Sequence, residues 1–198
     1  MKNLKCFLPG IFALTLASCM AQKTSIVTMV DETGNNQPLE DSVLNNLRNN
    51  NDIVIAYAVE NFAWARKINY TIIAQKNGEW KGYNYEKSLM KQNPSQNINS
   101  ISINKTACDS LANYIMQTKA WMIKGDNGKN FCANGNKNCN IYDVPTERLW
   151  VITKQTVINP SYYAPEFYER CCPDKDRALF LSVKKKIENC VSNKNVTQ

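Results

Sequence analysis

Residues 67–87 read KINYTIIAQKNGEWKGYNYEK. Apolar and polar residues alternate on both sides of Asn77-Gly78, a dipeptide typical of two-residue turns between antiparallel strands. A type I′ turn at this dipeptide pairs Lys76 with Glu79 and each earlier residue with one later residue. The segment therefore predicts a β-hairpin over residues 67–87.

In this register the two faces of the hairpin differ in character. Apolar and aromatic side chains share one face: Ile68, Tyr70, Ile72, Ala74, Tyr83 and Tyr85. Polar side chains dominate the other face: Asn69, Thr71, Gln75, Asn84 and Glu86, beside Ile73, Trp80 and Gly82. This division is typical of an antiparallel sheet that packs one face on a core and leaves the other mixed.

Further strands and helices flank the hairpin. Residues 52–60 are a nearly continuous apolar run of strand length, and residues 149–153 form a second strand. Residues 91–99 are polar and predict a loop. Helical spacing and helix-starting residues predict four helices: after Pro38, from Thr106, over 165–170 and from Asp174. Together these elements predict an α+β fold, in which two or three helices pack on an antiparallel sheet with the hairpin at its centre.

The N-terminus has the features of an export signal. Lys2 and Lys5 precede an apolar run at 6–16 that is too short to span a bilayer. The run ends in Leu16-Ala17-Ser18-Cys19, where small residues before the cysteine make a lipobox. On these residues the N-terminus resembles that of bacterial lipoproteins.

The resemblance implies cleavage before Cys19, whose thiol carries a diacylglycerol and whose new amine is acylated. It predicts a signal peptide at 1–18, a lipidated cysteine with a flexible tether at 19–37, and one globular domain at 38–198. Met20 replaces the aspartate that retains some lipoproteins at the inner membrane, so we expect a cell-envelope protein anchored at the outer membrane. The alternative is a plain secretory signal cut after Ala21.

Composition narrows the possible partners. Removal of the leader, with its two lysines, leaves 180 of 198 residues and lowers the formal net charge from +7 to +5. The charge is modest and spread along the chain, so with export to the envelope we expect no nucleic-acid partner. The expected partners are the lipid bilayer, through acylated Cys19, and an envelope protein, a peptide or a glycan.

Six cysteines remain after the leader and the lipidated residue: Cys108, Cys132, Cys139, Cys171, Cys172 and Cys190. An even set in an oxidising compartment predicts three disulfides that staple the domain. The spacing does not fit a zinc site and the chain has no histidine, so we expect neither a metal nor a cofactor.

The predicted last helix restricts the pairing of these cysteines. From Lys175 to Cys190 a helix rises about 22 Å, whereas bridged Cα atoms lie within about 7 Å. A bond between Cys190 and Cys172 is therefore excluded, and Cys190 is expected to reach Cys108, Cys132 or Cys139. The favoured local bridge is Cys132–Cys139.

The absence of histidine also limits the possible chemistry. It excludes Ser-His-Asp and Cys-His catalysis within this chain. A hydrolase that uses two carboxylates is conceivable, with candidates Asp143, Glu166 and Glu169.

An aromatic stretch at 161–168 supplies the candidate binding residues: Tyr162, Tyr163, Phe167 and Tyr168. Aromatic rings with polar tips suit a surface that contacts a peptide or a glycan. The alternative is a segment packed on the sheet and stapled by Cys171 or Cys172.

The sequence favours a binding or interaction module over an enzyme. The first alternative is a carboxylate-dependent hydrolase of cell-wall or extracellular glycans. The second alternative is a small periplasmic inhibitor.

Overall fold

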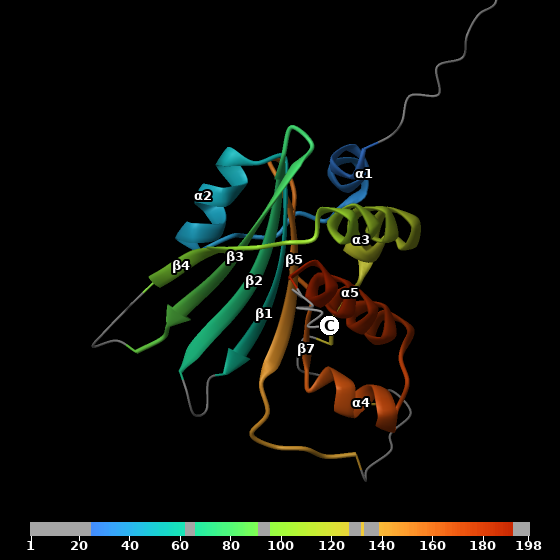
Figure 1. Cartoon of the computed structure of the whole chain (residues 1–198). Coiled ribbons are helices and arrows are strands. Elements are labelled where there is room, and N and C mark those ends of the chain that lie inside the picture. Colours follow the sequence, from blue (N-terminus) through green and yellow to red (C-terminus); the bar gives the residue numbers. More distant parts are fainter. Residues whose placement is uncertain (1–24, 62–65, 91–95, 127–131, 133–138, 192–198) are drawn as a thin grey trace, which may run out of the picture.

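The computed structural model describes residues 25–61, 66–90, 96–126, 132 and 139–191. Over these residues the chain forms five α-helices and a seven-stranded antiparallel sheet (Figure 1). The helices are α1 (Ile26–Thr33), α2 (Ser42–Asn50), α3 (Lys105–Thr118), α4 (Pro165–Cys171) and α5 (Lys175–Val191), with a 3-10 turn at Ala120–Met122. The strands are β1 (Ile53–Asn61), β2 (Lys67–Lys76), β3 (Glu79–Ser88), β4 (Gln96–Ile101), β5 (Thr146–Thr153), β6 (Val157–Ile158) and β7 (Ser161–Tyr163). The predicted signal peptide and Cys19 lie outside the described residues.

The sheet confirms the predicted α+β fold and the hairpin. Its strand order is β4-β3-β2-β1-β5-β6, and β7 also pairs with β5. β2 and β3 pair in the predicted register, with Lys76 opposite Glu79. Asn77 and Gly78 have φ angles of 51° and 81°, as a type I′ turn requires. The hairpin lies inside the sheet, between β1 and β4.

Helices cover both faces of the sheet, and β1 contributes to both cores. On one face, residues of α1, α3 and α5 pack with Ile55 of β1 and Ile73 of β2. On the other face, α2 places Leu44 in a second core with Val54 of β1 and Ile72 of β2. Figure 1 shows α2 on one side of the sheet and the other helices on the opposite side. β1 is therefore buried along most of its length.

The expected tether at 19–37 is wrong for residues 25–37, because α1 belongs to the folded domain. Ile26 and Val30 lie one helical turn apart and are buried in the core beside α3 and α5. The Ser25 hydroxyl accepts a hydrogen bond from the backbone N–H of Thr28 at 3.2 Å and caps the helix. Two apolar residues in a polar stretch are enough to dock a short helix when a core is available.

The expected loop at 91–99 is also partly wrong, because β4 begins at Gln96. β4 pairs with β3 in antiparallel register, with Asn99 opposite Asn84 and Ile101 opposite Gly82. Asparagine has a low strand propensity, but the hydrogen bonds of the ladder override it here. Gly82 permits this pairing, because a Cβ at position 82 would lie 2.3 Å from the Ile103 side chain.

The helix starts agree with the sequence in one place and differ in another. Asp174 caps α5 as predicted, accepting from the backbone N–H of Arg177 at 2.9 Å. α3 begins at Lys105, one residue before the predicted Thr106, because Asn104 is the cap and accepts from Ala107 N at 3.1 Å.

Two disulfides join adjacent cysteines at the end of α4 to a distant loop. Cys132 bonds to Cys172 with a Cα–Cα distance of 5.5 Å, and Cys139 bonds to Cys171 at 6.1 Å. The expected Cys132–Cys139 bridge is therefore wrong. The fold brings both loop cysteines to α4, which presents two partners side by side.

The remaining two cysteines are buried thiols on facing helices. Cys108 of α3 and Cys190 of α5 lie in the same core and have no exposed surface, and the Cys190 thiol donates to the Lys186 carbonyl at 3.2 Å. Cys190 thus reaches Cys108, one of its three predicted partners, but the structure has two disulfides among the described residues. A third disulfide stays a prediction.

Replacing Gly78 with valine is expected to destabilise the domain by about 1 kcal/mol or more, because a side chain at φ 81° is strained. No other atom lies within 4 Å of the Cβ position, so a clash would not contribute to the loss. Urea unfolding measures the change. The control is Lys76→Val, which adds the same side chain at an exposed strand position. Equal stabilities of the two variants would contradict the turn assignment.

Candidate binding site on the sheet

Helices cover only part of the sheet face that carries α1, α3 and α5. Near the β2–β3 turn this face is apolar, with Ile73 and Trp80 buried in the core. Towards the opposite end of the strands the same face becomes polar and exposed. Figure 1 shows β2, β3 and β4 fanning out away from α3 and α5.

The strand register aligns the exposed polar residues in two rows across three strands. Asn69 of β2 lies opposite Glu86 of β3, which lies opposite Asn97 of β4. In the next row Thr71 lies opposite Asn84, which lies opposite Asn99. We call these residues the amide face: Asn69, Thr71, Asn84, Glu86, Asn97 and Asn99.

The amide face lines a hollow of about 450 Å³. β1 continues the two rows with Val59 opposite Asn69 and Tyr57 opposite Thr71. Tyr57 is buried and Val59 is half-buried, so both give the hollow an apolar border on its β1 side. The Lys67 ammonium lies 2.7 Å from the Glu86 carboxylate and balances its charge. The hollow is therefore polar but close to neutral.

A buried ionic cluster borders the Tyr57 end of the hollow. Glu147 of β5 lies opposite Val59. Lys184 of α5 donates to both Glu147 carboxylate oxygens at 3.1 and 3.0 Å, pairs with Glu166, and lies 5.3 Å from the Tyr57 ring centroid.

Burial shifts the pKa values of two groups in this cluster, Glu147 and Tyr57. It raises the pKa of the Glu147 carboxyl, although Tyr57 and Lys184 oppose the shift. Burial and the neighbouring Glu147 carboxylate also raise the pKa of Tyr57 well above its usual range. At neutral pH the Tyr57 hydroxyl therefore stays protonated.

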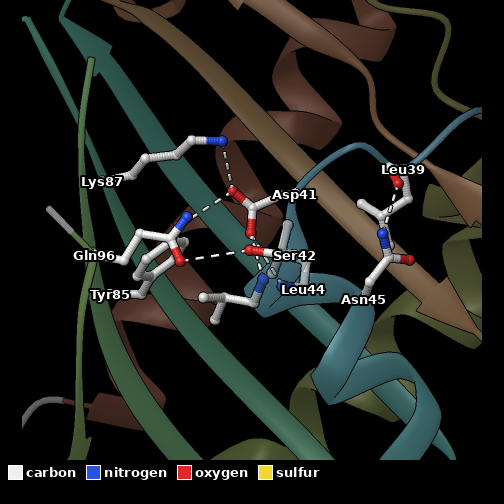
Figure 2. Close-up of polar contacts among 9 residues, drawn as sticks. Leu39, Asp41, Ser42, Leu44, Asn45, Tyr85, Lys87 and Gln96 are labelled. Carbon is white, nitrogen blue, oxygen red and sulfur yellow. Dashed lines mark hydrogen bonds and ion pairs between the residues drawn. The ribbon is translucent and has the colours of Figure 1, made fainter. Parts of the chain in front are cut away.

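On the opposite face, Asp41 anchors α2 to β3 (Figure 2). Its Oδ1 accepts from the backbone N–H groups of Val43 and Leu44 at 3.0 and 3.1 Å, which caps α2. Its Oδ2 accepts from Lys87 at 2.9 Å and from the Tyr85 hydroxyl at 3.2 Å. Burial and Asp41 together raise the pKa of Tyr85 above its usual range.

The first residue of α2 also reaches the edge strand. The Ser42 hydroxyl donates to the Gln96 side-chain oxygen at 3.4 Å, as Figure 2 shows. α2 thus contacts β3 and β4 from the opposite face of the sheet. These two strands supply Asn84, Asn97 and Asn99 to the amide face.

The four predicted binding aromatics do not form an exposed surface. Tyr162 is buried, with its ring centroid 5.0 Å from that of Phe180. Tyr168 is buried against Phe167, which like Tyr163 is half-buried. The structure therefore supports the alternative of a packed segment, stapled here by two disulfides.

The three carboxylates of the hydrolase alternative have different surroundings. Glu166 pairs with Lys184. Glu169 accepts from the backbone N–H of Asp174 at 3.1 Å. Asp143 is exposed, and none of the three lines the 450 Å³ hollow.

Sequence reasoning placed Asn69, Thr71, Asn84 and Glu86 on one face but missed two residues that complete it. Asn97 and Asn99 were assigned to a loop. They share a two-residue spacing with Ile101, and this alternation was the available signal. Glu147 carries no sequence signal, since only the fold places Lys184 beside it.

No family model matches the chain, and no curated protein matches it. Within the described ranges, no helix combines the length and apolar character needed to cross a bilayer. The same ranges contain no cluster of three or more His, Cys, Asp or Glu residues suited to hold a metal ion.

Replacing Asp41 with alanine is expected to cost about 2 kcal/mol or more, because it removes a helix cap and leaves buried donors unpaired. Thermal or urea unfolding measures the loss. Glu40→Ala is the control, since it removes a neighbouring exposed carboxylate. Similar losses in both variants would contradict the anchoring role of Asp41.

Proposed function

We propose that this chain is a lipid-anchored protein of the bacterial envelope that binds a neutral glycan on the amide face. The observation that carries the proposal is the alignment of Asn69, Asn84, Asn97 and Asn99 around one open hollow. The lipobox at Leu16-Ala17-Ser18-Cys19 supports the anchor.

The chemistry of the face favours a ligand rich in hydroxyl groups. Each asparagine side chain offers an acceptor oxygen and two N–H donors, and each sugar hydroxyl both donates and accepts. The ion pair of Lys67 with Glu86 leaves no large net charge to select an ionic ligand. Half-buried Val59, beside Tyr57, offers apolar surface at the β1 border of the hollow for the C–H groups of a sugar ring.

The double variant Asn84→Ala/Asn99→Ala is expected to weaken glycan binding on the order of tenfold, since it removes side-chain hydrogen bonds worth about 1 kcal/mol each. Affinity electrophoresis through gels containing dextran, starch or galactomannan measures the binding.

The matched control is Asn50→Ala, an exposed amide of α2 that lines a different hollow. We expect this variant to migrate like the unmodified protein. Absence of retardation of the unmodified protein in every gel, or equal losses in the double variant and the control, would overturn the proposal.

A hydrolase of cell-wall or extracellular glycans is the second candidate, and Glu147 is the observation that favours it. Its carboxyl is buried beside Tyr57 and shares the Lys184 ammonium with a second carboxylate, Glu166, so two carboxyl groups lie close together, as glycoside hydrolysis requires. Asp143 and Glu169, two candidates that the sequence offered for this alternative, would then have no role.

The two candidates differ in the expected effect of Glu147→Gln. If the protein is a hydrolase, the unmodified chain releases reducing ends from a polysaccharide and this variant loses the activity. If it only binds, no reducing ends appear and the variant retains its binding. Glu79→Gln, at the exposed hairpin turn, is the control.

A further inference from the structure

We infer that the β2–β3 turn end of the domain faces the lipid bilayer, and that the amide face opens at the end turned away from it. The inference rests on the lipid anchor of the proposed function. It assigns a partner, the bilayer surface, to an end of the molecule distinct from the glycan site.

The first step is the short length of chain between the anchor and the domain. Five residues separate Cys19 from Ser25, where the described chain begins. Six Cα–Cα steps span about 22 Å at most when fully extended. α1 follows at once and is fixed to the domain through buried Ile26 and Val30. An acylated Cys19 would therefore hold the start of α1 close to the membrane surface.

The second step is the position of α1 at the turn end of the sheet. The Asp31 carboxylate accepts from the Thr153 hydroxyl, at the end of β5. Thr153 lies opposite Ile53, and Ile53 lies opposite Gln75, two residues before the turn. Figure 1 shows α1 at the same end of the sheet as the β2–β3 turn.

The third step is the distance of the amide face from this end. Asn69 precedes Gln75 by six residues on β2, which corresponds to about 20 Å along the strand. The two rows of the amide face thus lie well beyond the turn. With α1 held at the bilayer, the two rows lie at the end of the domain that is farther from the membrane.

The surface at the turn end carries charges of both signs. Exposed lysines surround the turn and the end of β5: Lys76, Lys81 and Lys154. The exposed acids Glu32, Glu79 and Asp109 lie at the same end and equal them in number, so the position of α1, not net charge, selects the end that faces the bilayer. Positive side chains near a bilayer are attracted to anionic headgroups.

Fluorescence quenching in vesicles tests the orientation. The full-length lipidated protein is reconstituted in vesicles of phosphatidylethanolamine and phosphatidylglycerol that contain a lipid with a quencher on its headgroup. One cysteine is introduced at either end of the sheet, as Glu79→Cys or Asn97→Cys, and is labelled with a fluorescent maleimide. Native thiols do not interfere, because Cys108 and Cys190 are fully buried.

We expect the label at position 79 to be quenched several-fold more than the label at position 97. Insertion of a long Gly/Ser linker between Lys23 and Thr24 is expected to remove the difference. Vesicle flotation with equal quenching at both positions would overturn the orientation while leaving the anchor intact. Failure of the unmodified protein to float, as expected for Cys19→Ala, would overturn the anchor and the orientation together. Glycan binding by the unlipidated domain is measured separately and survives either result.

Discussion

The burial of β1 on both faces is the constraint on which the rest of the domain depends. A strand whose alternate side chains enter two cores needs cover on both sides of the sheet. α2 provides it on one side, and α1, α3 and α5 provide it on the other. The helices on the second side reach only part of the sheet. Its remaining surface is free to carry polar residues, and the proposed glycan site occupies that surface.

The predictable parts of the fold are those encoded by neighbouring residues. The hairpin register follows from Asn77-Gly78 and the alternation around it, and the helix cap at Asp174 is equally local. α1 and β4 were missed because their sequences are polar and only the assembled core or ladder stabilises them. Tertiary context overrides weak local preference in both elements.

For the same reason, the sequence predicts only part of the candidate site. The hairpin supplied two strands of the amide face, whereas its third strand depended on a ladder that joins separate parts of the chain. Aromatic density at 161–168 pointed to a surface, but Tyr162 and Tyr168 fill the interior. Aromatic rings serve cores and surfaces equally well, so composition alone does not separate the two uses. The disulfide partners could not be predicted, because each pair is far apart in sequence and only the folded chain brings the two cysteines together.

The adjacent cysteines at the end of α4 also have a consequence for the effect of proteolysis. Cys132 and Cys139 are both bonded to the same short segment, at Cys172 and Cys171. A protease that cut the backbone between them would release no fragment, since Cys132 stays joined to Cys172 across the cut. Cys139 would hold the other new end to Cys171. The chain can thus be nicked there and remain one covalent molecule.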